Sequence, residues 1–190
     1  MAVVTLKSLG ITNLDASPYI PQTTGEGAVA REHIANDQLT VGSGDSIGSI
    51  YRMVRIPTNA KIKRVDLFSA VATGGSADID VAFSDSLIDG TQAILQGQIV
   101  QFTGPVDNKL FGVGQSIVST LAAGPLTKTF ANTFTPAHQN LPLWQVLINL
   151  GVVSPTLFAF DPGGFFDIVL KVTTGITTGG VVSMEVRYAM

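Results

Sequence analysis

The sequence contains no cysteine and little charge for its 190 residues. The lack of cysteine excludes disulfide bonds, thiolate zinc sites and cysteine nucleophiles. Lys, Arg, Asp and Glu make up 13% of the chain, about half of the typical share. Apolar residues make up 45%, which is enough to drive folding. At this length we expect one domain, or one domain with an arm, that buries roughly 70% of the surface of the unfolded chain.

The few charges are unevenly distributed. Residues 1–95 carry 17 charged side chains and residues 96–190 carry 8, with none between Leu110 and Thr127. This deficit indicates that much of the C-terminal half is covered by another protein. A polar but uncharged surface is the alternative. The net charge of −3 argues against a general nucleic-acid binder, so we expect no specific nucleic-acid partner.

Long hydrophobic runs are also missing. The longest uncharged apolar stretch, Leu141–Phe160, is interrupted by Pro142, Pro155 and several polar residues, which excludes it as a membrane span. Met1–Leu14 has neither a long apolar run nor a small-residue cleavage pattern, so we expect no secretory signal. We therefore expect a protein without a membrane partner.

Residues 1–47 differ from the rest of the chain. Pro18 and Pro21 precede a polar, glycine-containing run, which favours an extended N-terminal arm with weak local order. One or two helical turns are expected at Ala28–Ala35. A first strand followed by a long loop is the alternative. The corresponding division is an arm over residues 1–47 and a β-domain over residues 48–190.

From Gly48 onward the pattern is that of β-strands. Gly48–Ile56, Lys61–Ala72 and Ala77–Ser84 are rich in strand formers, and the first two are separated by a turn at residues 57–60 that begins with proline. The second and third strands are expected to pair as a hairpin with Phe68 opposite Val81, which also places Arg64 opposite Asp85.

The strongest alternation lies at the C-terminus. Apolar residues recur at every second position in 166–172 and again in 182–188. Pairing the two runs as an antiparallel hairpin places Phe166 opposite Tyr188 and Asp167 opposite Arg187, so one register satisfies both faces. The connection Thr173–Val181 is too long for a tight turn.

One helix is expected at residues 141–150. Pro142 fits the first helical position, Gly151 fits the C-terminal cap, and the apolar residues lie on one face. Together with further short strands at Gln98–Thr103, Gln115–Leu121 and Leu126–Phe134, the pattern predicts an all-β fold. The architecture expected is an antiparallel, jelly-roll-like β-sandwich.

No motif predicts catalysis. The two histidines, His33 and His138, are 105 residues apart. Gly44–Gly48 matches the Gly-x-Ser-x-Gly sequence of a nucleophile elbow, but the elbow also needs a buried strand before the serine, and none is expected before Ser46. Asp78 and Asp80 share one strand face, which we interpret as solvated; a polar interface contact and a metal site are the alternatives. We expect no enzyme, no catalytic residue, no cofactor and no metal.

A basic cluster provides the candidate partner contacts. Five cations lie in 13 residues with no acid between them. An acidic patch on a protein partner would suit them, and an exposed strand face with edge-protecting lysines is the alternative. A nucleic-acid contact is less favoured, because only Tyr51 lies near to stack on bases. With one further arginine, the candidate partner-contact residues are Arg31, Arg52, Arg55, Lys61, Lys63 and Arg64.

Several segments resemble small structural proteins from the heads of tailed bacteriophages. The resemblance covers about half of the chain and brings no catalytic motif. The segments that carry it are Gly25–Glu32, Gly44–Ala70 with its Ile56–Ile62 turn, Ser76–Asp85 and Asp161–Tyr188.

This resemblance implies a capsid decoration or cement protein that binds the major capsid protein and bridges subunits of the shell. It also implies a homo-oligomer, for which we expect three-fold symmetry, located on the capsid surface of the virion after synthesis in the host cytoplasm. Two alternatives remain open. One is another virion component, such as a tail, connector or receptor-binding part. The other is a carbohydrate-binding β-sandwich outside any virus.

Overall fold

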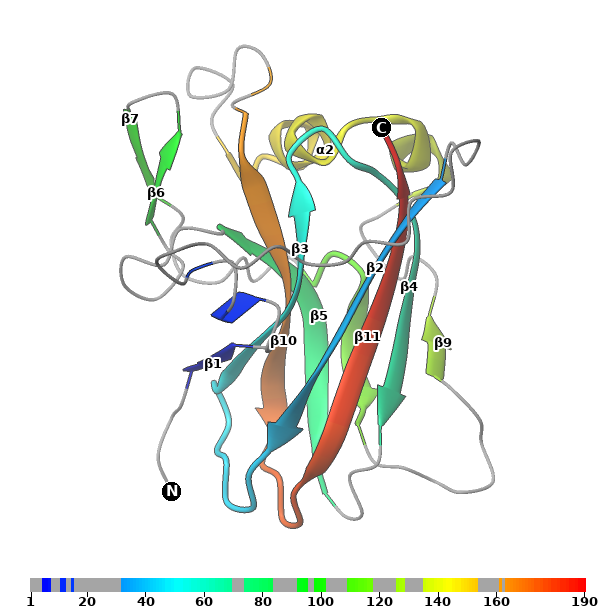
Figure 1. Ribbon diagram of the computed structural model, residues 1–190. Coiled ribbons are helices and arrows are strands. Elements are labelled where there is room, and N and C mark those ends of the chain that lie inside the picture. Colours follow the sequence, from blue (N-terminus) through cyan, green and yellow to red (C-terminus); the bar gives the residue numbers. More distant parts are fainter. Residues whose placement is uncertain are drawn as a thin grey trace.

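The computed structural model of the chain consists mainly of β-strands, with one short α-helix and one 3-10 turn among the described residues (Figure 1). The predicted all-β class is confirmed. No helix in the described part of the chain is long and apolar enough to cross a membrane. The structure describes residues 5–7, 11–12, 15, 32–69, 74–83, 92–95, 98–101, 109–117, 126–128, 135–153, 161 and 163–190.

Two sheets face each other across the core, and a two-stranded sheet stands apart from them. Sheet A has the order β1-β3-β10-β5-β8, and sheet B has the order β2-β11-β4-β9. The strands of sheet A are β1 (Thr5–Lys7), β3 (Ile50–Pro57), β10 (Phe165–Thr174), β5 (Ser76–Phe83) and β8 (Gly112–Ser116). Those of sheet B are β2 (Glu32–Val41), β11 (Gly180–Ala189), β4 (Lys61–Ser69) and β9 (Leu126–Lys128). The separate pair is β6 (Gln92–Leu95) and β7 (Gln98–Gln101).

The strand order is that of a jelly roll. The chain alternates between the sheets from β2 through β5, and again from β8 through β11. The four strands β2-β11-β4-β9 therefore pack against the four strands β3-β10-β5-β8, which is the double-sheet arrangement of two Greek keys. β1 adds a parallel strand at the β3 edge of sheet A. The predicted jelly-roll-like sandwich is confirmed at the level of topology.

The core lies between the two sheets. Phe166, Ile168 and Leu170 of β10 face Met184 and Val186 of β11 within one buried apolar cluster that both sheets share. These are the residues that the alternation of 166–172 and 182–188 assigned to the apolar face. The two predicted C-terminal strands and their core-facing sides are confirmed.

Both predicted hairpins are wrong in their pairing. β10 pairs with β3 and β5 in sheet A, whereas β11 pairs with β2 and β4 in sheet B. Phe166 therefore lies opposite Ile56 and Phe83, and not opposite Tyr188. β4 and β5 are likewise in different sheets. The physical reason is that two alternating strands can share an apolar core by facing each other across a sandwich as well as by pairing side by side.

The predicted helix is confirmed as α2 (Leu143–Asn149). Pro142 occupies the N-cap position, and Gly151 follows the helix with a φ of 70°, a backbone conformation that glycine adopts without strain. The first two helical N–H groups donate to Ala60 and Thr58 in the turn between β3 and β4. These bonds fix α2, together with the 3-10 turn η1 (Pro136–Asn140), at one end of the sandwich (Figure 1).

Part of residues 1–47 belongs to the sandwich. β2 pairs with β11 through ten consecutive residues, from Glu32 opposite Ala189 to Val41 opposite Gly180. Neither the arm nor a first strand followed by a long loop predicted this ten-residue strand, and the helical turns expected at Ala28–Ala35 are absent from residues 32–35. The reason is that Ala35, Leu39 and Val41 contribute to the shared core. Residues 28–31, and most of the remaining N-terminal residues, lie outside the described residues.

The loop between β10 and β11 passes close to the end of β2, which leads to a first prediction. A Cβ atom on Gly179 would overlap the carbonyl oxygen of Val41 and lie 3.1 Å from the backbone nitrogen of Ser43. Gly179→Ala is expected to lower the free energy of unfolding by about 1–3 kcal/mol. Gly175→Ala is the matched control, because its Cβ would make only an ordinary contact at 3.4 Å. Urea unfolding of both variants tests this, and equal midpoints would contradict it.

Candidate interaction surfaces

The outer face of sheet A, which points away from the core, is largely covered by the chain itself. Ile50, Ala82 and Val169 form a second, small buried cluster apart from the main core. Asp15 of the N-terminal segment reaches Arg55 on the same face. Ile11, from that segment, is fully buried.

Two arginines, two aspartates and one lysine form a charged network on this face. Asp167 of β10 accepts hydrogen bonds from Nη1 of Arg52 at 2.9 Å and from Nε of Arg55 at 2.8 Å. Nη1 of Arg55 also donates to Asp15 at 2.6 Å, and Nζ of Lys7 donates to Asp15 at 2.7 Å. The side chains of Arg52 and Asp167 are buried. The network therefore ties β3, β10 and the N-terminal segment together.

A register shift brings both arginines to the same side of β3. Ile168 pairs with Val54, but Val169 pairs with Arg52, so Met53 has no partner in this ladder. In a regular strand, residues three apart point to opposite faces. The irregularity turns Met53 and Val54 both into the main core and directs Arg52 and Arg55 to Asp167.

The charges of the network shift one another's pKa values. Burial raises the pKa of Asp15, but hydrogen bonds and charge from Arg55 and Lys7 outweigh it and hold that pKa below its usual value. Burial lowers the pKa of Arg55, yet Asp167 and Asp15 raise it overall. Burial raises the pKa of Asp167 against the opposing effect of the two arginines.

The structure separates the members of the predicted basic cluster. Arg52 and Arg55 are paired within the chain, and their burial removes them from the surface that a partner would touch. Lys63 donates to the carbonyl of Gln139 at 2.8 Å and so holds η1. Arg64 is partly exposed and pairs with Asp66 on its own strand.

The two remaining candidates of the six are Lys61 and Arg31. Lys61 begins β4 and is partly exposed, whereas Arg31 lies outside the described residues. Partner contacts by Arg31, Lys61, Lys63 and Arg64 remain predictions. The expected pair of Asp167 with Arg187 is not formed, because Asp167 binds Arg52 and Arg55 whereas Arg187 pairs with Glu185. Asp85, the expected partner of Arg64, lies outside the described residues.

Asp78 and Asp80 are buried, so the prediction of a solvated strand face is wrong. Asp78 accepts a hydrogen bond from the backbone N–H of Gly114 at 2.7 Å, and Asp80 accepts one from the N–H of Lys109 at 3.1 Å. The two carboxylates thus fasten the segment at 109–114 to β5. The described residues contain no group of three or more His, Cys, Asp or Glu side chains placed to hold a metal ion.

The two histidines make separate structural contacts. The His33 ring stacks on Tyr188 with 5.3 Å between ring centroids. Nδ1 of His138 accepts a hydrogen bond from the N–H of Thr135 and closes the first turn of η1. Ser46 lies in the loop between β2 and β3.

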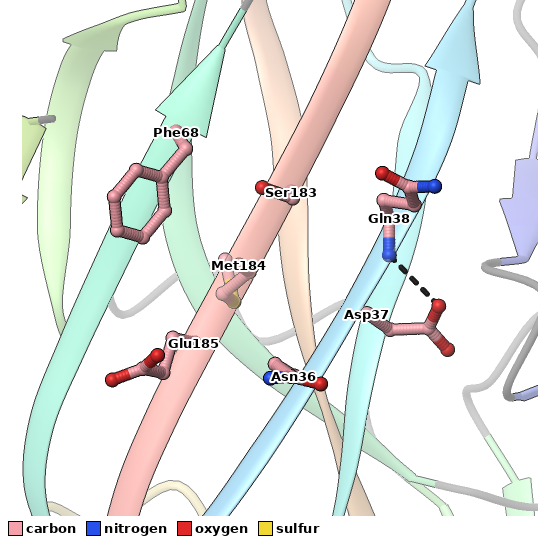
Figure 2. A pocket seen from close by; sticks show the side chains of 7 residues that line it. All are labelled: Asn36, Asp37, Gln38, Phe68, Ser183, Met184 and Glu185. Atoms are coloured by element: carbon pink, nitrogen blue, oxygen red, sulfur yellow. Dashed lines mark hydrogen bonds between the residues drawn. The ribbon is translucent and has the colours of Figure 1, made fainter.

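The outer face of sheet B differs from that of sheet A because it is open among the described residues. In one row across three strands, Gln38 of β2, Ser183 of β11 and Phe68 of β4 lie side by side. Figure 2 shows Phe68 and Gln38 on either side of the small Ser183. A serine between two larger side chains leaves a shallow hollow of about 340 Å³, which Asn36 and Glu185 also line.

This face combines exposed apolar side chains with internally paired charges. Ile34, Phe68 and Val181 are each 40–41% exposed, and their strand positions place them all on the outer side of sheet B. Arg64 pairs with Asp66, and Arg187 pairs with Glu185 at 2.8 Å. A partner that covers this face therefore contacts apolar side chains, and the arginines that it covers already have their counter-ions within the chain.

The sequence alone did not identify the sheet B face. The alternation of Ala35, Asp37, Leu39 and Val41 is the signal that predicts β2, but the expected arm and helical turns obscured it. Without β2, Asn36 and Gln38 cannot be placed beside β11.

Comparisons with known proteins give little similarity. No protein-family model matches the chain, and no curated protein matches it. Among solved structures, a chain of the Cyanophage Pam1 capsid asymmetric unit is similar at 11% sequence identity and a TM-score of 0.35, covering 93% of this chain and 96% of that chain. A TM-score this low does not by itself assign the fold, so the jelly-roll assignment rests on the strand order described above.

Proposed function

We propose that the chain is a structural virion protein that decorates a capsid, binding the major shell protein through the outer face of sheet B. The observation that carries the proposal is the contrast between the two outer faces. The sheet A face is largely covered by the chain, with Phe165 exposed at the start of β10, whereas the sheet B face exposes Ile34, Phe68 and Val181 beside internally paired charges. The sequence resemblance to phage head proteins is the reason for naming the major capsid protein as the partner.

The size of the face supports attachment as an oligomer. Three neighbouring strands of about ten residues cover roughly 30 Å by 14 Å, which is about 400 Å². A standard interface takes about 800 Å² from each partner. One copy is therefore expected to bind the shell weakly. Linking copies into a homo-oligomer, which we propose to be a trimer, raises the overall affinity, because binding of the first copy raises the effective concentration of the others at the shell. Bound copies that bridge shell subunits stabilise the shell by mass action.

The test has two parts, of which the first is the copy number in particles purified from the source of this sequence. We expect hundreds of copies, in fixed ratio to the major shell protein. A few to a few tens of copies would overturn the decoration proposal in favour of a tail or connector part. Absence from particles would overturn any virion function.

The second part is attachment of purified variants to particles that lack the protein. Phe68→Lys places a charge in the hollow and is expected to reduce occupancy at least about tenfold, the size of effect that loss of an aromatic hot spot has at an interface. Phe165→Lys is the matched control, because Phe165 is also exposed but lies at the start of β10 in sheet A. Equal occupancy of the two variants would exclude the sheet B face as the contact surface.

A further inference from the structure

β2 is the long edge strand of the sandwich. Its ten residues pair with β11 on one side, and no other described strand pairs with them on the other side. The other outer strands of the two large sheets, β1, β8 and β9, have three to five residues each. A long edge strand offers a row of backbone N–H and C=O groups to a further strand, whereas a short one offers few. Among the described strands of these two sheets, β2 is therefore the edge best suited to pair with another chain.

β2 lacks most of the devices that protect an edge strand. It contains neither proline nor lysine, and its ladder with β11 runs through ten pairs without a register shift. The ladders of β10 with β3 and β5, and of β11 with β4, each contain such a shift. Bulges twist an edge away from a second strand, and lysine or proline interrupts pairing. The protection of β2 must therefore come from another feature.

Asp37 interrupts the apolar side of β2. Ala35 and Leu39, two positions before and after it, belong to the main core, and Met184 of the core lies opposite it on β11. The Asp37 carboxylate accepts a hydrogen bond from the backbone N–H of Gln38 at 2.8 Å. Figure 2 shows this bond on the side of β2 that faces away from β11. The carboxylate thus occupies an N–H group that a further strand would otherwise bind, and a charge at an inward-facing position is a recognised way of protecting an edge.

There is space beside this part of β2. A hollow of about 390 Å³ lies between the Gln38–Thr40 stretch and the N-terminal residues Leu6, Lys7 and Thr12. Neighbouring strands of a sheet lie about 4.8 Å apart, so a strand that pairs with β2 would run along this hollow. The described N-terminal residues therefore leave this stretch of the edge accessible.

A second copy of this chain suits the edge. When β2 pairs antiparallel with β2 of a second copy about a two-fold axis, the outward N–H groups of each strand meet the C=O groups of the other, because the same surface serves both copies. Asp37 is the sixth of the ten residues. The two-fold axis therefore brings the two Asp37 carboxylates close to the middle of the pair, where like charges repel and lose water.

We propose that β2 is a pairing edge for a second copy of this chain, and that Asp37 keeps this edge closed. The carboxylate acts in two ways, because it occupies the Gln38 N–H and because its charge opposes the approach of an identical strand. This inference goes beyond the proposed function and holds whether or not the sheet B face binds a capsid.

Sedimentation velocity of the full chain over a range of concentrations tests the proposal. Asp37→Val removes the charge, frees the Gln38 N–H and completes the apolar alternation of β2. We expect this variant to form particles of twice the native mass at concentrations at least about tenfold lower than the native chain requires, because each pair gains the released hydrogen bond from both copies. Glu32→Val is the matched control, since it removes the same charge from the first residue of the same strand, and we expect it to behave as the native chain does.

A second substitution locates the contact. Gln38→Pro removes the N–H that points away from β11, so it blocks pairing at the edge and leaves the ladder with β11 in place. Combined with Asp37→Val, it is expected to restore the native mass. Asp37→Asn removes the charge and keeps a side-chain acceptor, so it is expected to shift the mass in the same direction by less. It provides the same test if Asp37→Val does not fold.

Two results would overturn the proposal. One is that neither Asp37 variant associates more than the native chain and Glu32→Val. The other is a doubled mass that persists in the Asp37→Val/Gln38→Pro variant, since this would place the contact on another surface. Circular dichroism of all variants establishes that they fold before their masses are compared.

Discussion

Replacing Asp167 by alanine is expected to lower the free energy of unfolding by about 3–5 kcal/mol. The carboxylate is fully buried and accepts hydrogen bonds from both Arg52 and Arg55. Its removal leaves the buried Arg52 guanidinium without its counter-ion, whereas Arg55 keeps Asp15. The energy lost is mainly the desolvation of a charge that can no longer be compensated.

The matched control is Glu185→Ala, which removes an ion pair with Arg187 on the exposed face of sheet B. Such a solvent-screened pair contributes little to the free energy of unfolding. Urea unfolding at one protein concentration compares the two variants, since oligomer formation would otherwise shift the midpoints. A loss below about 1 kcal/mol for Asp167→Ala would contradict the structural role given to the network.

Replacement of Phe166 by alanine is expected to cost about 3–5 kcal/mol as well, for a different reason. Phe166 precedes Asp167 on β10 but points to the opposite side, where it is fully buried between the two sheets. Truncation removes apolar contact and leaves a cavity that the strands of both sheets can close only in part.

Phe165→Ala provides the control from the same strand. Phe165 is half exposed, so its truncation is expected to change the free energy of unfolding by about 0.5 kcal/mol or less. The same urea measurements apply. Comparable losses for Phe165→Ala and Phe166→Ala would mean that the alternation along β10 does not decide which side chains form the core.

The candidate surfaces were less accessible to sequence reasoning than the fold. The sequence predicts that Arg52 and Arg55 belong to one exposed basic cluster. Neighbouring residues give no sign that Asp167, more than a hundred residues later, contacts both of them. The unpaired Met53 that turns both arginines to one face arises from the ladder with β10. Phe68 and Ser183 likewise become neighbours only when β4 and β11 pair.

For β10 and β11, the sequence by itself determined where the strands run and which side of each is apolar. Alternation in 166–172 and 182–188 and the proline turn after Ile56 are local properties that act through residues two to four positions apart. The tertiary structure alone decided which strands pair. β10 and β11 carry matching apolar faces, and hydrogen bonding side by side or packing face to face would bury those faces equally well. β3 and β5 pair with β10, and β2 and β4 pair with β11, so pairing depended on the whole chain and not on either strand.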